Sequence, residues 1–94
     1  MTITIGGTTF DHATYDERGD VLYLHLGERQ PAADSDGTPE GHAVRYGPDG
    51  EVIGITIVNA RWLLDRDGKI TITVPERIDV SADVLASALT SPAA

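Results

Sequence analysis

The side chains of this 94-residue chain that could do chemistry gather in one short stretch, "YDERGDVLYLH". It places Asp16 and Asp20 between Tyr15 and Tyr23, and it ends on His25. Two carboxylates at this spacing could hold a ligand or cation, or act as an acid and a base. Asp16 could equally close an Asx turn by accepting backbone N–H bonds from the residues that follow it. We favour the structural interpretation and keep all five residues as candidates for a ligand or interface site.

Trp62 is the sixth candidate, because a lone tryptophan often anchors a protein interface. It stands beside Leu63 and Leu64 in the stretch "NARWLLD". This stretch fits either a short strand or a single helical turn, so the pattern does not fix the direction of the indole. A core plug beneath a helix is the alternative to an interface anchor, and we prefer the core plug.

Three histidines, His12, His25 and His42, would form a metal site if neighbouring strands brought them together. Their spacing matches no helical or loop metal motif, and the chain has no cysteine to add a sulfur ligand. The stretches "DSDGTPE" and "DRDG" resemble calcium loops, but Pro39 and Ile70 stand where such a loop needs glycine. We therefore predict no metal and no cofactor.

Signatures of covalent and phosphate chemistry are missing as well. No serine stands in a Gly-x-Ser-x-Gly turn, and no glycine-rich phosphate loop is present. Carboxylates are so abundant that a pair of them carries no argument for acid–base catalysis without geometry. We predict no catalytic residue, and a small metal-dependent or acid–base enzyme is kept only as the alternative function.

Charge narrows the class of partner. The chain has 15 acidic and 7 basic residues, and its formal net charge is -8. Such a surface repels phosphate backbones and anionic lipids and attracts a basic protein, so we expect neither nucleic acid nor membrane as a partner. The first residues lack a signal peptide's basic and apolar regions, and no apolar run could span a bilayer. A cytoplasmic protein is the expectation.

Period-two hydrophobicity predicts the fold. Apolar and polar residues alternate in several short runs, and turns rich in Gly, Pro and Asp separate them. Residues 27–41 show no periodicity and are expected to form a long loop, whereas helical spacing follows Ser81. We predict one α+β domain over 1–94, an antiparallel meander of five or six strands with an N-terminal hairpin at 2–12 and a single C-terminal helix at about 81–90.

The strands have two apolar faces. The predicted core consists of Leu22, Leu24, Leu26, Val44, Ile53, Ile55, Ile57, Ile70, Ile72 and Val74. The opposite face carries Val21, Tyr23, Val52 and Val58. Because one helix covers one face only, we predict that a second copy of the chain or another protein covers the other face.

Over about residues 13–61 the chain resembles a family of small prokaryotic proteins, domain of unknown function family 2283 (DUF2283). The residues that carry the resemblance are Tyr15, Asp16, Asp20, Leu22, Tyr23, Leu24, Leu26, Gly47, Asp49, Gly50, Val52, Ile53, Gly54, Ile55, Ile57, Asn59 and Ala60. The chain departs from the family pattern in its added N-terminal hairpin and in Asn59, where aspartate is commoner.

The resemblance implies a small β-rich fold and no particular activity. Some members resemble partners of small neighbouring proteins in toxin–antitoxin-like pairs. Together with the acidic composition, this favours a non-enzymatic protein-binding or regulatory module, antitoxin-like in its narrower form. The expected partner is a second copy of the chain or a small basic protein.

Overall fold

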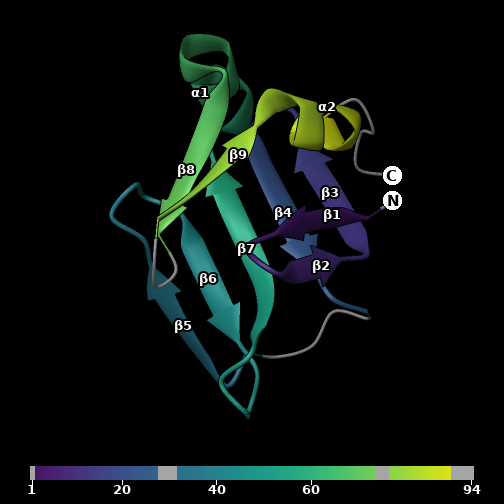
Figure 1. The fold of residues 1–94 in the computed structure, drawn as a ribbon, viewed down its shortest axis with the longest axis vertical. Coiled ribbons are helices and arrows are strands. Elements are labelled where there is room, and N and C mark those ends of the chain that lie inside the picture. The colour runs from purple at the N-terminus through teal and green to yellow at the C-terminus, as the bar shows by residue number, and fades with distance from the viewer. Residues whose placement is uncertain (1, 28–31, 74–76, 90–94) are drawn as a thin grey trace.

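The computed structural model describes residues 2–27, 32–73 and 77–89 (Figure 1). Within them the strands are β1 (Ile3–Ile5), β2 (Thr8–Phe10), β3 (His12–Asp16), β4 (Val21–His25), β5 (Asp34–Gly37), β6 (Ala43–Tyr46), β7 (Val52–Val58), β8 (Lys69–Thr73) and β9 (Arg77–Ser81). The helices are α1 (Ala60–Asp67) and α2 (Ala82–Leu89). The predicted α+β class and antiparallel sheet are confirmed.

Five strands form the central antiparallel sheet, in the order β3-β4-β7-β6-β5. The chain makes the β3-β4 hairpin, crosses to the far edge, and returns through β5 and β6 to place β7 beside β4. The order therefore differs from a simple meander at one connection, the one after β4. Its consequence is that the two most apolar strands, β4 and β7, lie next to each other in the middle of the sheet.

Two smaller hairpins and α2 cover one face of this sheet. β1 pairs with β2 across Gly6 and Gly7, as the glycine pair predicts, and β8 pairs with β9. Gly6 has a φ of 57°, and a Cβ added there would collide with the side-chain end of Ile78, so the turn packs closely on β9. α2 contacts β1, β3 and β9, which closes the covered side (Figure 1).

The core lies between these two layers. Eight of the ten predicted core residues are buried; Leu26 is only partly buried, and Val74 lies outside the described residues. The covering layer adds Ile3, Ile5, Phe10, Val80, Leu85, Ala88 and Leu89. Val52, expected on the opposite face, is partly buried and packs against the core, next to a register shift between Arg45 and Tyr46.

Three elements differ from the sequence prediction, and one of them is β9, which pairs with β8 where no strand was expected. β5 runs through the segment expected to be a loop, and all four of its residues are exposed. It pairs with β6 and has no buried residue, so no hydrophobic alternation could reveal this strand in the sequence. The ambiguous stretch before Gly68 forms a second helix, α1, which ends because Gly68 takes a left-handed φ of 73°.

α2 matches the predicted C-terminal helix closely, with Asp83 in its first turn. The prediction that Pro92 ends the helix falls on residues outside those described. Neither helix among the described residues has the length and apolarity that a membrane crossing requires.

Candidate functional site

Asp20 joins two parts of the chain that are far apart in sequence. It follows the β3-β4 turn with a left-handed φ of 55°, and its backbone carbonyl accepts the Ala60 N–H at 3.0 Å. Its carboxylate accepts the backbone N–H groups of Arg61 at 2.8 Å and Trp62 at 3.1 Å. The carboxylate of Asp20, the residue just before β4, thus caps the first turn of α1. Free N–H groups and the helix dipole favour negative charge there.

Tyr15 completes this junction from β3. Its ring is buried, and its hydroxyl donates a 2.7 Å hydrogen bond to Asp20 Oδ1. Burial raises the pKa of the Tyr15 phenol above its ordinary value, and the bond to Asp20 adds to the rise. Burial also works to raise the pKa of Asp20, but the hydrogen bonds from Tyr15, Arg61 and Trp62 outweigh it and lower that pKa. Both groups are thereby held in a single protonation state at neutral pH.

Asp16 closes the β3-β4 turn. Its Oδ1 accepts the backbone N–H groups of Arg18 at 3.1 Å and Gly19 at 3.3 Å. This is the Asx turn that the sequence predicts. Three polar residues in the first half of the motif therefore have structural tasks: Tyr15 and Asp20 hold α1, and Asp16 holds the turn.

Asn59 precedes α1 with a left-handed φ of 59° and makes no side-chain capping bond. Asparagine and aspartate are the non-glycine residues that tolerate this conformation best. The aspartate that is commoner in the family would meet the same backbone requirement. The left-handed backbone at position 59 therefore accommodates either residue.

A cleft opens beside this junction, with a volume of about 720 Å³. The residues that line this Trp62 cleft are Tyr15, Glu17, Asp20, Arg61, Trp62, Asp65 and Leu89. Trp62 is 56% exposed, and the Arg66 guanidinium lies 4.6 Å from its ring centroid. The preferred core-plug prediction for Trp62 is wrong: α1 turns Leu64 toward the core, and the indole two residues earlier faces solvent.

Tyr23 and His25 lie on the other face of the five-stranded sheet. They line a smaller cavity of about 360 Å³ together with Thr14, Leu24, Arg45 and Thr56. The His25 ring stacks on His12 across the β3-β4 pair, with centroids 4.7 Å apart and planes 4° from parallel. The six candidate residues are thus divided between two surfaces: Tyr15, Asp20 and Trp62 meet at the cleft, Asp16 stays in its turn, and Tyr23 and His25 occupy the open face.

The third histidine does not join this pair. His25 is paired with Gly54, whereas His42 hydrogen-bonds Val58, four residues further along β7. Within residues 2–27, 32–73 and 77–89, no group of three or more His, Asp or Glu side chains is arranged to hold a metal ion. Sequence reasoning named His42 only as a metal candidate and did not foresee that it is buried, with an exposed fraction of 2%.

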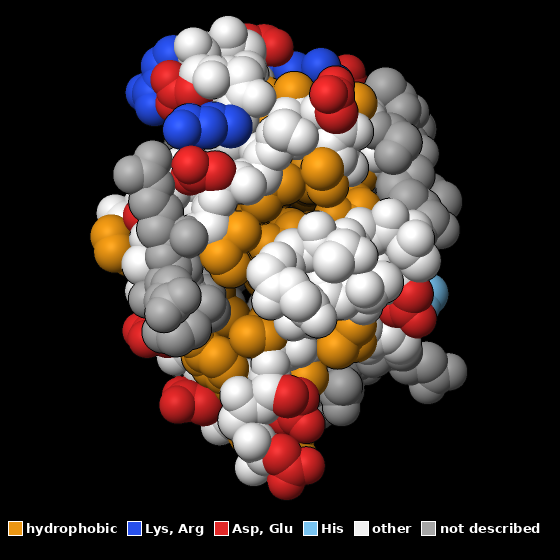
Figure 2. Space-filling view, viewed as in Figure 1, with side chains coloured by type: hydrophobic (Ala, Val, Ile, Leu, Met, Phe, Trp, Pro, Cys, Tyr) orange, Lys and Arg blue, Asp and Glu red, His pale blue; other side chains and the backbone are white. Residues whose placement is uncertain are grey.

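The basic residues are less scattered than their sequence positions suggest. Figure 2 shows Lys and Arg side chains gathered over α1 and the start of β8, where Arg61, Arg66 and Lys69 lie. Carboxylates are interleaved with them: Arg66 bonds Asp67 at 2.8 and 3.0 Å, and Lys69 contacts Asp79 at 3.3 Å. This neutralisation leaves no strongly basic patch among the described residues.

Comparison with known proteins supports the resemblance seen in the motif. No curated protein and no solved structure matches the chain. The family model described as "Protein of unknown function (DUF2283)" matches residues 12–61, which is more than half of the 94 residues. This range contains Tyr15, Asp16, Asp20 and Asn59, and it ends one residue before Trp62. The protein is therefore a member of the DUF2283 family.

Proposed function

We propose that this protein is a non-enzymatic protein-binding module that holds a basic partner protein at the Trp62 cleft. The observation that carries the proposal is the exposed indole of Trp62 at the edge of a cleft that Tyr15 and Arg61 also line. Tryptophan, tyrosine and arginine dominate the binding energy of protein interfaces. An exposed tryptophan is costly to leave in water and gains most when a partner covers it.

Charge favours a basic partner. The lining residues contribute the carboxylates of Glu17, Asp20 and Asp65 and the guanidinium of Arg61, and the Arg66 guanidinium lies over the Trp62 ring. The chain as a whole carries a formal charge of -8. Such a surface steers a cationic protein toward it and repels nucleic acid, with an association rate that falls as salt rises. A cytoplasmic location is part of the proposal, because a chain without cysteine is suited to a reducing compartment.

The acid–base alternative is weaker at this cleft. A general acid or base works best with a pKa near the working pH. The pKa of Asp20 is lowered and that of Tyr15 is raised, so both move away from neutrality. The Asp20 carboxylate is also occupied by the hydroxyl of Tyr15 and two N–H groups of α1. These side chains position the cleft wall and leave binding to Trp62 and its neighbours.

Affinity capture with two variants tests the proposal. Wild-type protein and Val84→Ala are expected to retain a stoichiometric partner of high isoelectric point, and Trp62→Ala is expected to lose it. Val84 is the matched control because it is another exposed apolar residue, 41% exposed, on α2. The partner should elute as salt rises. Equal capture by Trp62→Ala, or an acidic partner that salt does not release, would contradict the proposal. The identity of the partner then decides whether the role is antitoxin-like.

A homodimer through the open sheet face is the second candidate. Tyr23 and Val58 are each 37% exposed on this face, and both are large apolar residues. Sedimentation equilibrium should show a dimer that Tyr23→Glu dissociates, because a charge at a buried interface is costly. A single monomeric species up to the highest soluble concentration would remove this candidate and leave the Trp62 cleft unaffected.

A further inference from the structure

His42 is the buried polar residue of the described core, and the fold satisfies only one side of its ring. Nδ1 accepts the Val58 backbone N–H at 3.1 Å. Because an acceptor nitrogen carries no proton, the proton of the neutral ring must reside on Nε2. Burial lowers the pKa of His42 and keeps the ring neutral at pH 7, although the nearby Glu40 carboxylate partly opposes this. Nε2–H is therefore a fixed hydrogen-bond donor.

That donor has no hydrogen-bond partner among the residues that the structure describes. An unsatisfied buried donor destabilises the folded state, so folded proteins supply a partner from the chain, from water or from a ligand. The nearest carboxylate in the sequence does not supply one. Both oxygens of Glu40 are occupied by Thr73, one by its N–H at 2.9 Å and the other by its hydroxyl at 2.8 Å.

His42 is one of the residues that line a cavity of about 260 Å³, which we call the His42 cavity. Its walls are Glu40, His42, Leu63, Arg66, Asp67, Lys69, Ile70 and Thr71. A water molecule occupies about 30 Å³ of liquid, so this space exceeds what a single bridging water fills. Leu63 and Ile70 form an apolar wall, and the remaining walls are polar, which is the usual make-up of a small-molecule site.

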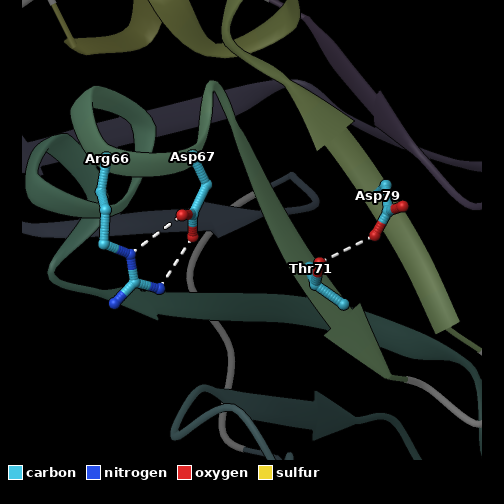
Figure 3. A network of polar contacts seen from close by, with 4 residues as sticks. All are labelled: Arg66, Asp67, Thr71 and Asp79. Carbon is cyan, nitrogen blue, oxygen red and sulfur yellow. Dashed lines mark hydrogen bonds and ion pairs between the residues drawn. The ribbon is translucent and has the colours of Figure 1, made fainter.

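Cationic groups stand at this cavity, and the carboxylates beside them are already engaged. Figure 3 shows Arg66 bonded to Asp67 on α1 and, alongside, Thr71 of β8 bonded to Asp79 of β9. Lys69 adds an ammonium group with three donors, one of which is directed to Asp79. An incoming anion would therefore meet N–H donors while the wall carboxylates face their own partners.

We propose that the His42 cavity binds a small carboxylate, one oxygen of which accepts the Nε2–H of His42 while Lys69 compensates the charge. The acceptor satisfies a buried donor for which the described residues supply no partner, and charge-assisted bonds of this kind are the stronger ones. A ligand carrying a short apolar group would place it against Leu63 and Ile70. The site is separate from the Trp62 cleft and does not depend on the proposed protein partner.

Acetate titration followed by NMR of the His42 ring nitrogens tests the site. Acetate at constant ionic strength should shift the Nε2–H resonance and the Thr71 amide saturably, in the millimolar range expected for so few atoms. Acetamide, which has the acceptor without the charge, should bind more weakly. Chloride alone should leave both resonances in place. Shifts that chloride reproduces, equal binding of acetamide, or no acetate shift at all would each overturn the proposal.

Lys69→Gln is the variant, because Lys69 is at the rim and its side chain is 44% exposed. Removing its charge should weaken acetate binding about five-fold, the effect of one cation at contact distance in water. Arg18→Gln is the matched control, since it removes one cation from the exposed β3-β4 turn. Equal weakening in both variants would show that only net charge matters and would also overturn the assignment.

Discussion

Asp20 and His42 differ in how the fold treats their hydrogen-bonding atoms. Asp20 accepts bonds from Tyr15, Arg61 and Trp62, and each donor would otherwise lack a partner at a helix start or in the core. His42 has one nitrogen bonded to Val58 and the other without a described partner, beside a cavity. A polar residue whose bonds are complete explains structure, whereas His42, whose bonds are incomplete, is where we propose that a ligand fits.

Replacing Asp20 should have the largest effect. Asp20→Ala removes the carboxylate that caps α1 and leaves the buried Tyr15 hydroxyl without its acceptor. The lost helix cap and the unsatisfied Tyr15 hydroxyl both destabilise the folded state. Together they predict a decrease of about 2–4 kcal/mol in the free energy of unfolding. Urea denaturation measures it, with Asp36→Ala on the exposed edge strand β5 as the control. Equal stability of the two variants would mean that Asp20 is dispensable for the fold.

Tyr15→Phe should cost less, because the ring still fills its buried site. The loss of one bond to a charged acceptor predicts about 1–2 kcal/mol. Asp20 has a lowered pKa in the folded state, so its contribution is complete above the unfolded value and is lost as pH falls through the folded pKa. Without the Tyr15 donor that folded pKa rises, and acid unfolding should begin at higher pH. Tyr46→Phe is the control, and an unchanged acid transition in Tyr15→Phe would contradict the prediction.

Protonation of His42 should reduce the free energy of unfolding at a higher pH than protonation of Asp20 does. The pKa of His42 is lowered by burial, so the unfolded chain takes up its proton first as pH falls. Stability is then complete above about pH 6.5, the ordinary value, and declines below it until the folded ring is protonated too. Protonation also removes the Nδ1 acceptor used by Val58. Urea denaturation at pH 7 and 5 should show a smaller decline in His42→Gln than in wild type. An equal decline would mean that other groups cause it.

Lys69→Gln should have the smallest effect on stability. Its ion pair with Asp79 is formed between side chains that are 44% and 41% exposed, and such pairs contribute little. Thermal unfolding of the variant should match wild type within experimental error. A clear loss would mean that Lys69 holds the β8-β9 hairpin. The acetate affinity measured with Lys69→Gln would then have to be calculated from its folded fraction alone.

Alternation along the chain predicted most of the central sheet and its buried face. The alternation did not predict elements whose position depends on distant parts of the chain. β5 has four exposed residues and is held by backbone bonds to β6, so hydrophobic periodicity could not reveal it. Trp62 sits in a stretch too short to distinguish strand from helix, and only the helix explains why the indole is exposed while Leu64 is buried.

The sequence predicted individual residues of the candidate site but not which of them come into contact. The motif led to Tyr15, Asp16 and Asp20, and the Asx turn at Asp16 is a local effect that residue spacing encodes. The bond from Asp20 to Arg61 spans 41 positions and depends on the order of the strands. The burial of His42 likewise depends on where β6 meets β7 and α1, which no local signal reports.

By itself the sequence determined the two-faced strands, the turns between them, the acidic charge and membership of a family. These follow from period-two hydrophobicity, from glycine and aspartate conformations and from composition, all of which act over a few residues. Only the tertiary structure decided that Asp20 caps a distant helix, that Trp62 faces solvent and that His42 keeps an unused donor. Such outcomes depend on which distant groups packing brings within about 3 Å of one another, since hydrogen bonds act only at that range.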